Sequence, residues 1–487
     1  MRRLVVVGIL LAAGACTPHR PPTLDGMPGA PSQPNEAWTP SPAMKARVQR
    51  ANPTIAPAAI PAATSRLSMA DIVDLALRNN PATRLSWAQA RASADAYGAS
   101  RGQYFPTLSI DVGGTQSQPL APSGLLPQRY QYGPTLSLSY LILDFGGRAG
   151  NVDFARQTAV AADLSHNASV QNTILTAEQA LFDYQAARAQ RDAQRTAVQE
   201  ATANLSSAEE RHRVGLATIA DVLQARTARS QAQLTLESLE GSVHIAQGSL
   251  AVAMGIPANA AYEPPVFTDS LCPDSLGVIT QSIDTMIAVA TRNRPDLEAA
   301  RAQVAAAAAQ VHVARSGLYP TMALNANSGY TSSSVPGYRG RTYSVGLTFD
   351  LPAFTGLARQ YSLRSATDQL DAANARAEQT RQQIALQVFT AYYNLQTATE
   401  RVRTSADLLA SATESESVAR GRYREGVGSI VDLLIAQTAL ADARAQAAQA
   451  TWQWHSSLAQ LAHDVGALGL RGETLAPLGS DTSRSNR

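Results

Sequence analysis

The hydrophobic positions of this chain follow two different periods. In two long stretches without proline, 148–211 and 359–422, apolar residues recur every three or four positions, as on one face of a helix. The clearest run is Ile384, Val388, Ala391, Leu395, Ala398 and Val402. Alternating spacings of four and three are the seam of a coiled coil. Each stretch predicts about 100 Å of helix at about 1.5 Å per residue.

The second period is two, which predicts β-strands. It occurs at about 105–117 and 132–144, and again at about 319–330 and 341–351. Strands of about ten residues with one apolar face fit a half-buried sheet or a membrane barrel with a wet lumen. Flanking aromatic residues favour the barrel, because such rings suit the lipid interface; these are Phe105, Tyr130, Tyr132, Tyr319, Tyr330 and Tyr338. Four strands cannot close a barrel, and lipid does not tolerate open edges, so several chains would share one.

The whole pattern occurs twice, which indicates a tandem duplication over 67–256 and 282–466. An offset of 214 residues aligns Arg78 with Arg292 and Pro81 with Pro295, and the offset becomes 211 after the strands. Each repeat is predicted to hold two shorter helices, a strand pair, a long helix and a return helix. The return helices are expected at 219–254 and 430–465, and the segments 82–103 and 296–317 would stack above them.

The long and return helices of each repeat are joined by one motif, RHRVGLATIAD from Arg211 and RYREGVGSIVD from Arg422. We predict that a glycine ends the long helix in a left-handed conformation and that a hydroxyl residue caps the return helix, with an aspartate as its capping-box partner. The turn residues are Gly215, Thr218 and Asp221 in the first tip (211–221) and Gly426, Gly428, Ser429 and Asp432 in the second (422–432). The aspartates are either caps worth about 1 kcal/mol or carboxylates that line an opening in a symmetric assembly. The two roles are compatible.

The N-terminus carries targeting signals. MRRLVVVGILLAAGAC has a basic start, a short apolar core and small residues, which predicts a signal peptide over 1–15. Cys16 resembles the acylated cysteine of bacterial lipoproteins, with ordinary signal cleavage nearby as the alternative. By the same resemblance, Thr17 favours the outer membrane. Residues 16–66 are rich in proline and are expected to form an extended arm. No later apolar run is long enough for a membrane-spanning helix.

Composition argues against several other functions. Only 16% of residues are charged and the net charge is +2, so nothing favours nucleic-acid binding. Cys272, in the expected linker 257–281, is the only other cysteine, so we expect no disulfide framework. The histidines lack metal-ligand spacing, and neither a phosphate-binding loop nor GxSxG occurs. We therefore predict a protein that is not an enzyme and has no metal or cofactor. Residues 467–487 are expected to form a C-terminal tail.

The twin turn motif, the paired NP and RP helix starts and the two strand pairs resemble the TolC outer-membrane factor family over nearly the whole mature chain. That resemblance implies an α+β membrane protein in which a homotrimer builds a twelve-stranded barrel in outer-membrane lipid, four strands per chain, continued by a long α-helical tunnel in the periplasm. The turns would form a gated aperture. Tyr423 and Asp221 match residues that hold this aperture shut in the family, and Asp432 matches a ring of carboxylates. Gly428 stands where the family has an arginine, and Ile435 where some members have a second acidic ring.

The function implied by the resemblance is a passive exit duct for small molecules, which works with an inner-membrane pump and a periplasmic adaptor. An outer-membrane component of a type I protein secretion system would need the same tunnel and stays open as an alternative. A soluble periplasmic coiled-coil adaptor is the alternative from another class. Such an adaptor would lack the paired ten-residue strands and the duplicated hairpins.

Overall fold

The computed structural model describes residues 67–468 except 119, 122, 123, 126, 127, 266–280, 335, 336 and 338, together with two short strands near the N-terminus. The chain divides into two compact units, Met1–Ala59 and Ile60–Arg487. In the first, β1 (Thr23–Leu24) pairs antiparallel with β2 (Met27–Pro28). The predicted signal peptide, Cys16 and Cys272 lie outside the described residues, as do most of the arm, much of the linker and nearly all of the tail.

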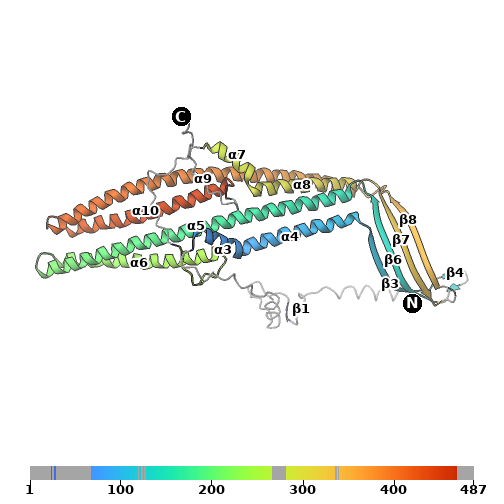
Figure 1. The fold of residues 1–487 in the computed structure, drawn as a ribbon, viewed down its shortest axis with the longest axis horizontal. Coiled ribbons are helices and arrows are strands. Elements are labelled where there is room, and N and C mark those ends of the chain that lie inside the picture. The colour runs from blue at the N-terminus through green and yellow to red at the C-terminus, as the bar shows by residue number, and fades with distance from the viewer. Residues whose placement is uncertain are drawn as a thin grey trace, which may run out of the picture. The chain divides into compact units, whose positions relative to one another are not determined.

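The second unit contains two sets of helices that follow the duplication. The first set is α3 (Met69–Asn79), α4 (Pro81–Arg101), α5 (Gly147–Arg213) and α6 (Ile219–Ala253), with a short 3-10 turn η1 (Gly102–Tyr104) after α4. The second set is α7 (Ile283–Asn293), α8 (Pro295–Ser316), α9 (Ala358–Arg424) and α10 (Ile430–Asp464). Each long helix has 67 residues and each return helix 35. Figure 1 shows the α5/α6 and α9/α10 hairpins side by side, with both turns at the same end.

The starts of the shorter helices follow from local chemistry. The Ser68 side chain accepts a hydrogen bond from the Asp71 N–H, and the Asp71 carboxylate accepts one from the Ser68 N–H, which is a complete capping box at α3. Pro81 and Pro295 are the first residues of α4 and α8, where the missing N–H costs no helical hydrogen bond. The same device therefore starts the equivalent helix in both repeats.

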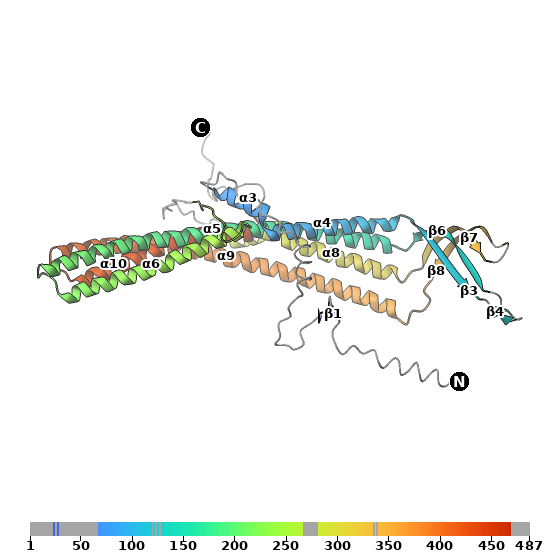
Figure 2. The ribbon, with the colours of Figure 1, turned by 90° about the horizontal axis from the view of Figure 1, so that it is seen from below.

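One antiparallel sheet joins the repeats at the end of the helices opposite the turns (Figures 1 and 2). Its order is β3-β6-β7-β8, with β3 at Thr107–Ser117, β6 at Arg129–Leu143, β7 at Thr321–Ser333 and β8 at Arg339–Asp350. In the connection from β3 to β6, two further strands, β4 (Leu120–Ala121) and β5 (Gly124–Leu125), pair with each other. The central β6–β7 pair contains one strand of each repeat. The sheet is thus built equally from the two halves of the chain.

The two faces of the sheet differ in polarity, as the alternating pattern predicts. Leu138 pairs with Ala326, which pairs with Val345, so apolar side chains share one face. On the other face, Ser139 Oγ donates to Asn325 Oδ1 at 3.1 Å, and Asn325 Nδ2 donates to Thr348 Oγ1 at 3.2 Å. The large apolar side chains of β3 and β8 are exposed within a single chain.

The helical core is built largely from alanine and aliphatic residues. Every residue of the predicted seam from Ile384 to Val402 is at most 4% exposed. A first core cluster gathers around Ile72, Leu181, Leu250 and Met254, and a second around Leu297 and Val388. Small alanine side chains let the helices approach closely along their length. Among the described residues, no helix combines the length and apolar character needed to cross a bilayer.

Candidate functional site at the hairpin tips

The two turns close by the same pair of backbone hydrogen bonds. In the first tip, the Gly215 N–H donates to the His212 carbonyl at 2.9 Å and the Leu216 N–H donates to the Arg211 carbonyl at 2.8 Å. Gly215 has a φ of 77°, a region that favours glycine. These bonds and this conformation form a Schellman motif, which satisfies the last carbonyls of α5. The predicted left-handed glycine is therefore present.

The second tip repeats this arrangement. The Gly426 N–H donates to the Tyr423 carbonyl at 3.2 Å and the Val427 N–H donates to the Arg422 carbonyl at 3.0 Å, with φ of 75° at Gly426. Gly428 packs closely against the same helix end. A Cβ added to Gly428 would lie 3.0 Å from the Arg422 Cβ, a tight contact that a larger residue would have to relieve by a small movement of its neighbours.

Both return helices begin with the predicted capping box. The Asp221 carboxylate accepts from the Thr218 N–H at 2.8 Å and from the Thr218 hydroxyl at 2.9 Å, and the Asp221 N–H donates to that hydroxyl at 3.2 Å. Ser429 and Asp432 form the equivalent pair. In both boxes the hydrogen bonds to the carboxylate fall on Oδ2 alone. The capping role thus leaves the other carboxylate oxygen available.

Arg211 connects the first tip to the second. Its guanidinium lies 4.8 Å from the ring centroid of Tyr423 and donates from one terminal nitrogen to the Tyr423 carbonyl at 2.8 Å. This contact combines a cation–π interaction with satisfaction of a carbonyl near the end of α9. The two turns are consequently held side by side within one chain.

A small apolar cluster supports that contact. It draws on all four helices that meet at the tips, and its buried members are Ala208, Val222, Ala225, Tyr423, Ile430 and Leu433. Tyr423 is 9% exposed and Ile430 is 3% exposed. Moving one hairpin away from the other would expose this cluster, so the packing opposes separation of the tips.

The Tyr423 hydroxyl is buried without a hydrogen-bond partner in the described part of the chain. Burial raises the pKa of the Tyr423 phenol; Arg211 opposes this change, and Asp221 adds to it. No hydrogen bond joins the hydroxyl to Asp221 within the chain. The gate contact between Tyr423 and Asp221 therefore stays a prediction.

The other predicted tip residues are accessible. Asp432 is exposed, and Ile435 is 64% exposed on the same helix. His212 Nδ1 lies 3.0 Å from the Ala217 carbonyl, which places the imidazole against its own turn. Within the described ranges, no group of three or more His, Cys, Asp or Glu residues is arranged to hold a metal ion.

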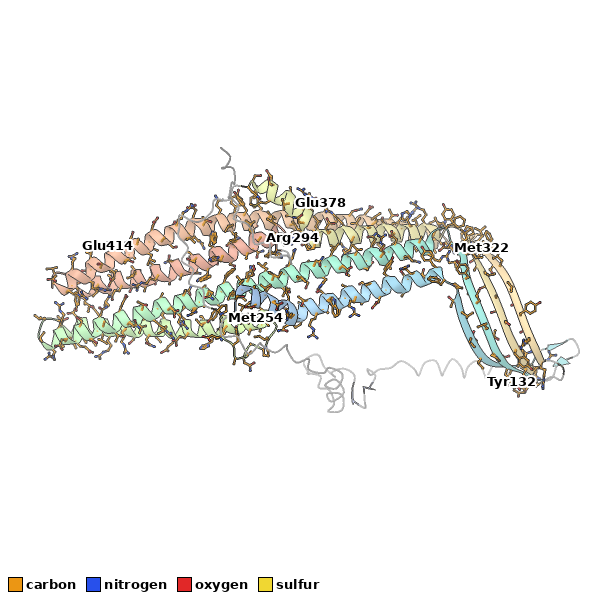
Figure 3. The ribbon with its side chains drawn as sticks, in the orientation of Figure 1. Tyr132, Met254, Arg294, Met322, Glu378 and Glu414 are labelled. Atoms are coloured by element: carbon orange, nitrogen blue, oxygen red, sulfur yellow. The ribbon has the colours of Figure 1, made fainter. Side chains whose placement is uncertain are left out.

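Sequence reasoning missed a buried polar network far from the tips. Arg294 contacts Asp464 at 3.4 Å and Asp296 at 2.6 Å, and His463 lies 2.9 Å from Asp464 and 2.8 Å from Asn172. Figure 3 labels Arg294 where α8 begins beside the end of α10. The repeat alignment hides this network, because the first repeat has Ala253 at the position of Asp464.

The model of the family described as outer membrane efflux protein matches residues 72–256 and 286–467, which covers both repeats. Protein CyaE of Bordetella pertussis is 29% identical over 388 residues, covering 78% of this chain and 79% of that protein. The probable efflux pump outer membrane protein TtgC of Pseudomonas putida is 24% identical over 390 residues, covering 77% and 78%.

Solved structures show the same fold. The outer membrane protein VceC of Vibrio cholerae matches with a TM-score of 0.73 at 20% identity, over 82% of this chain and 96% of that one. The open state of the MtrE outer membrane channel of Neisseria gonorrhoeae matches with a TM-score of 0.70 at 19% identity, over 82% and 88%. The predicted fold class and family resemblance are confirmed: this chain belongs to the outer membrane efflux protein family.

Proposed function

We propose that this chain is the outer-membrane exit duct of a tripartite efflux pump, which passes small molecules from the periplasmic side to the exterior. The observation that carries the proposal is the family match over both repeats of a chain whose two-faced sheet lies opposite two closed helical tips. Efflux across the outer membrane is the role named for the family, and TtgC is named as a probable efflux pump component.

The sheet supports assembly of three copies. Among the described strands, β3 pairs only with β6 and β8 pairs only with β7, so each has a free edge. A free edge in lipid leaves backbone groups without hydrogen bonds, which the hydrocarbon does not tolerate. Pairing β8 of one copy with β3 of the next closes a barrel of twelve strands when three copies meet. The apolar face then contacts lipid, and the Ser139–Asn325–Thr348 face lines the lumen.

The duct works with partner proteins and carries a lipid anchor. A periplasmic adaptor and an inner-membrane pump supply contacts and energy, because the sequence carries no motif for binding a nucleotide. Cys16 provides a lipid anchor in the outer membrane. The long α5 and α9 helices reach away from the sheet toward the adaptor, so the tips are the part of the duct that a partner meets first.

The gate in this proposal is the pair of tips. Asp221, Tyr423 and Asp432 bias what passes and hold the closed state, while Arg211 keeps the two turns of each chain together. Opening separates turns whose shared apolar cluster favours contact. The closed state depends mainly on packing and on Tyr423, because Gly428 and Ile435 supply no charge at positions where the family carries charged residues.

The gate is tested by replacing Tyr423 with Phe and Asp432 with Ala in one variant. The phenyl ring keeps the packing of Tyr423 but removes its buried hydroxyl, and the second change removes an exposed carboxylate from the tip. We expect a higher single-channel conductance in planar bilayers than for the unmodified trimer.

A matched control replaces Tyr361 with Phe and Asp368 with Ala, near the sheet end of α9, the helix that carries Tyr423. This pair makes the same chemical changes far from the tips and should leave conductance unaltered. Equal conductance in all three proteins would remove the gating role and leave Asp432 with its helix cap alone.

A further inference from the structure

We propose that Arg422 of one copy packs on His212 of the next, so that the contact between tips within a chain is repeated between chains. The partner is therefore a second copy of this chain, and the surface is the exposed side of the first tip. The inference rests on the trimer proposed above. It adds the residues through which neighbouring subunits meet at the tips.

The template is the contact of Arg211 with Tyr423, at 4.8 Å from guanidinium carbon to ring centroid. The 211-residue offset of the duplication aligns Arg211 with Arg422 and His212 with Tyr423. Around a ring of three chains, first and second tips alternate. The first tip contacts the second tip of its own chain through Arg211 and Tyr423. The second tip then contacts the first tip of the following copy through the equivalent residues, Arg422 and His212.

Exposure of the equivalent residues supports this step. Ile430 is 3% exposed because the first tip covers it, whereas its counterpart Ile219 is 59% exposed. Tyr423 is buried, whereas its counterpart His212 is exposed. Exposed apolar groups whose counterparts are buried mark a surface that a neighbour covers. The second tip of another copy can cover this surface as the first tip covers Ile430 within a chain, because the two tips arose from one duplicated hairpin.

Arg422 has the chemistry for the contact. Its guanidinium is exposed and makes no hydrogen bond or ion pair with the described residues. A guanidinium stacks on an aromatic face and can donate at the same time to a carbonyl. The Tyr423 carbonyl accepts from both Arg211 and the Gly426 N–H. The His212 carbonyl accepts from the Gly215 N–H in the same way, so its second lone pair is available for Arg422.

Crosslinking of the full-length protein in detergent tests the proximity. In a Cys272→Ser background, Arg422→Cys and His212→Cys are combined and treated with a short bismaleimide. We expect a covalent trimer on a denaturing gel. The pair Arg211→Cys and Tyr423→Cys, at the template contact, should crosslink within single chains and serves as the positive control. Its product would run as a monomer.

The outcomes separate the two proposals. If the protein is trimeric by light scattering but the 422/212 pair gives no species larger than a monomer, the tip contact is overturned. The exposed Ile219 would then have to be covered by something other than a second copy, such as an adaptor hairpin. A protein that is monomeric by light scattering overturns the proposed duct itself.

Substitutions provide a second measurement that does not depend on crosslinking. His212→Tyr recreates the Arg–Tyr pairing between chains and should slow the heat dissociation of the trimer, whereas Arg422→Ala should speed it. Arg424→Ala is the matched control, because it removes a neighbouring exposed arginine outside the proposed contact. Equal effects of the two arginine changes, or faster dissociation of His212→Tyr, would overturn the proposal.

Discussion

Thr218 and Asp221 show how one short segment can carry a structural role and leave room for another. Both capping hydrogen bonds to the carboxylate use Oδ2, and the hydroxyl both donates and accepts within the same turn. The helix start is therefore complete without any contribution from Oδ1. A carboxylate in this position can keep α6 in place and still present charge at the tip, which is the basis of its proposed part in the gate.

Removing the cap hydroxyl with Thr218→Ala should destabilise the start of α6 by about 1 kcal/mol, a typical value for loss of an N-cap. The effect is local, so hydrogen exchange of backbone amides in 211–225 is the appropriate measurement, and exchange there should become faster. Thr227→Ala is the control, since the Thr227 hydroxyl bonds only to the Leu223 carbonyl of its own helix. Unchanged exchange in Thr218→Ala would show that the cap contributes nothing at this tip.

The capping boxes could be predicted from the sequence because each lies within four consecutive residues. The Arg211–Tyr423 contact could not, since it joins residues 212 apart and depends on how two hairpins pack. Aligning the repeats places Arg211 beside Arg422, which shows that the residues are equivalent but not that one of them contacts the other tip. The buried state of Tyr423 likewise follows from packing between hairpins.

The helices of the two repeats match in length, but the ends of the return helices α6 and α10 are held by different kinds of contact. The end of α6 is apolar, with Met254 fully buried in the first core cluster. The end of α10 instead carries Asp464 in an ion pair with Arg294, whose side chains are 5% and 8% exposed. His463 extends this network to Asn172 on α5. The end of α10 is thus held by polar contacts, which include a contact to the first repeat, whereas the end of α6 is held by hydrophobic packing.

Breaking this network with Asp464→Ala should lower the free energy of unfolding by roughly 3–5 kcal/mol, because a buried Arg294 loses a partner. Asp296 remains bonded to Arg294, which favours the lower end of that range. The midpoint of urea unfolding, followed by circular dichroism, measures the change. Asp442→Ala removes an exposed carboxylate from the same helix and should stay within about 0.5 kcal/mol of the unmodified protein. Similar midpoints for both variants would contradict a stabilising network.

Element boundaries were predicted less well than element types. β6 begins at Arg129, three residues before its expected start, and β3 begins at Thr107, two residues after. Alternation marks where side chains change faces, but pairing decides where a strand ends: Arg129 joins β6 because Ser117 of β3 extends far enough to pair with it. Pro106 cannot donate a ladder hydrogen bond, which explains the later start of β3.

The whole molecule combines a sheet that needs lipid on one face with helices that do not. Along β8, Tyr343, Val345, Leu347 and Phe349 form an exposed apolar row, while Ser344 and Thr348 point to the other face. Only assembly and insertion give both faces a suitable environment. In the proposed trimer, stability of the sheet is therefore inseparable from assembly, and a change on one face should have a different effect from the same change on the other.

Arginine substitutions at adjacent residues of β8 test this difference. Val345→Arg places a charge on the apolar face near the middle of the strand, where the cost in a membrane barrel is about 2–4 kcal/mol per chain. Ser344→Arg adds the same side chain to the polar face, where the lumen can hydrate it. We expect heat-modifiable trimers in outer-membrane fractions to be depleted for Val345→Arg and retained for Ser344→Arg. Depletion of Ser344→Arg alone would reverse the assigned faces, and retention of both would show that this row does not contact lipid, because a buried charge facing hydrocarbon in three copies at once cannot be without effect.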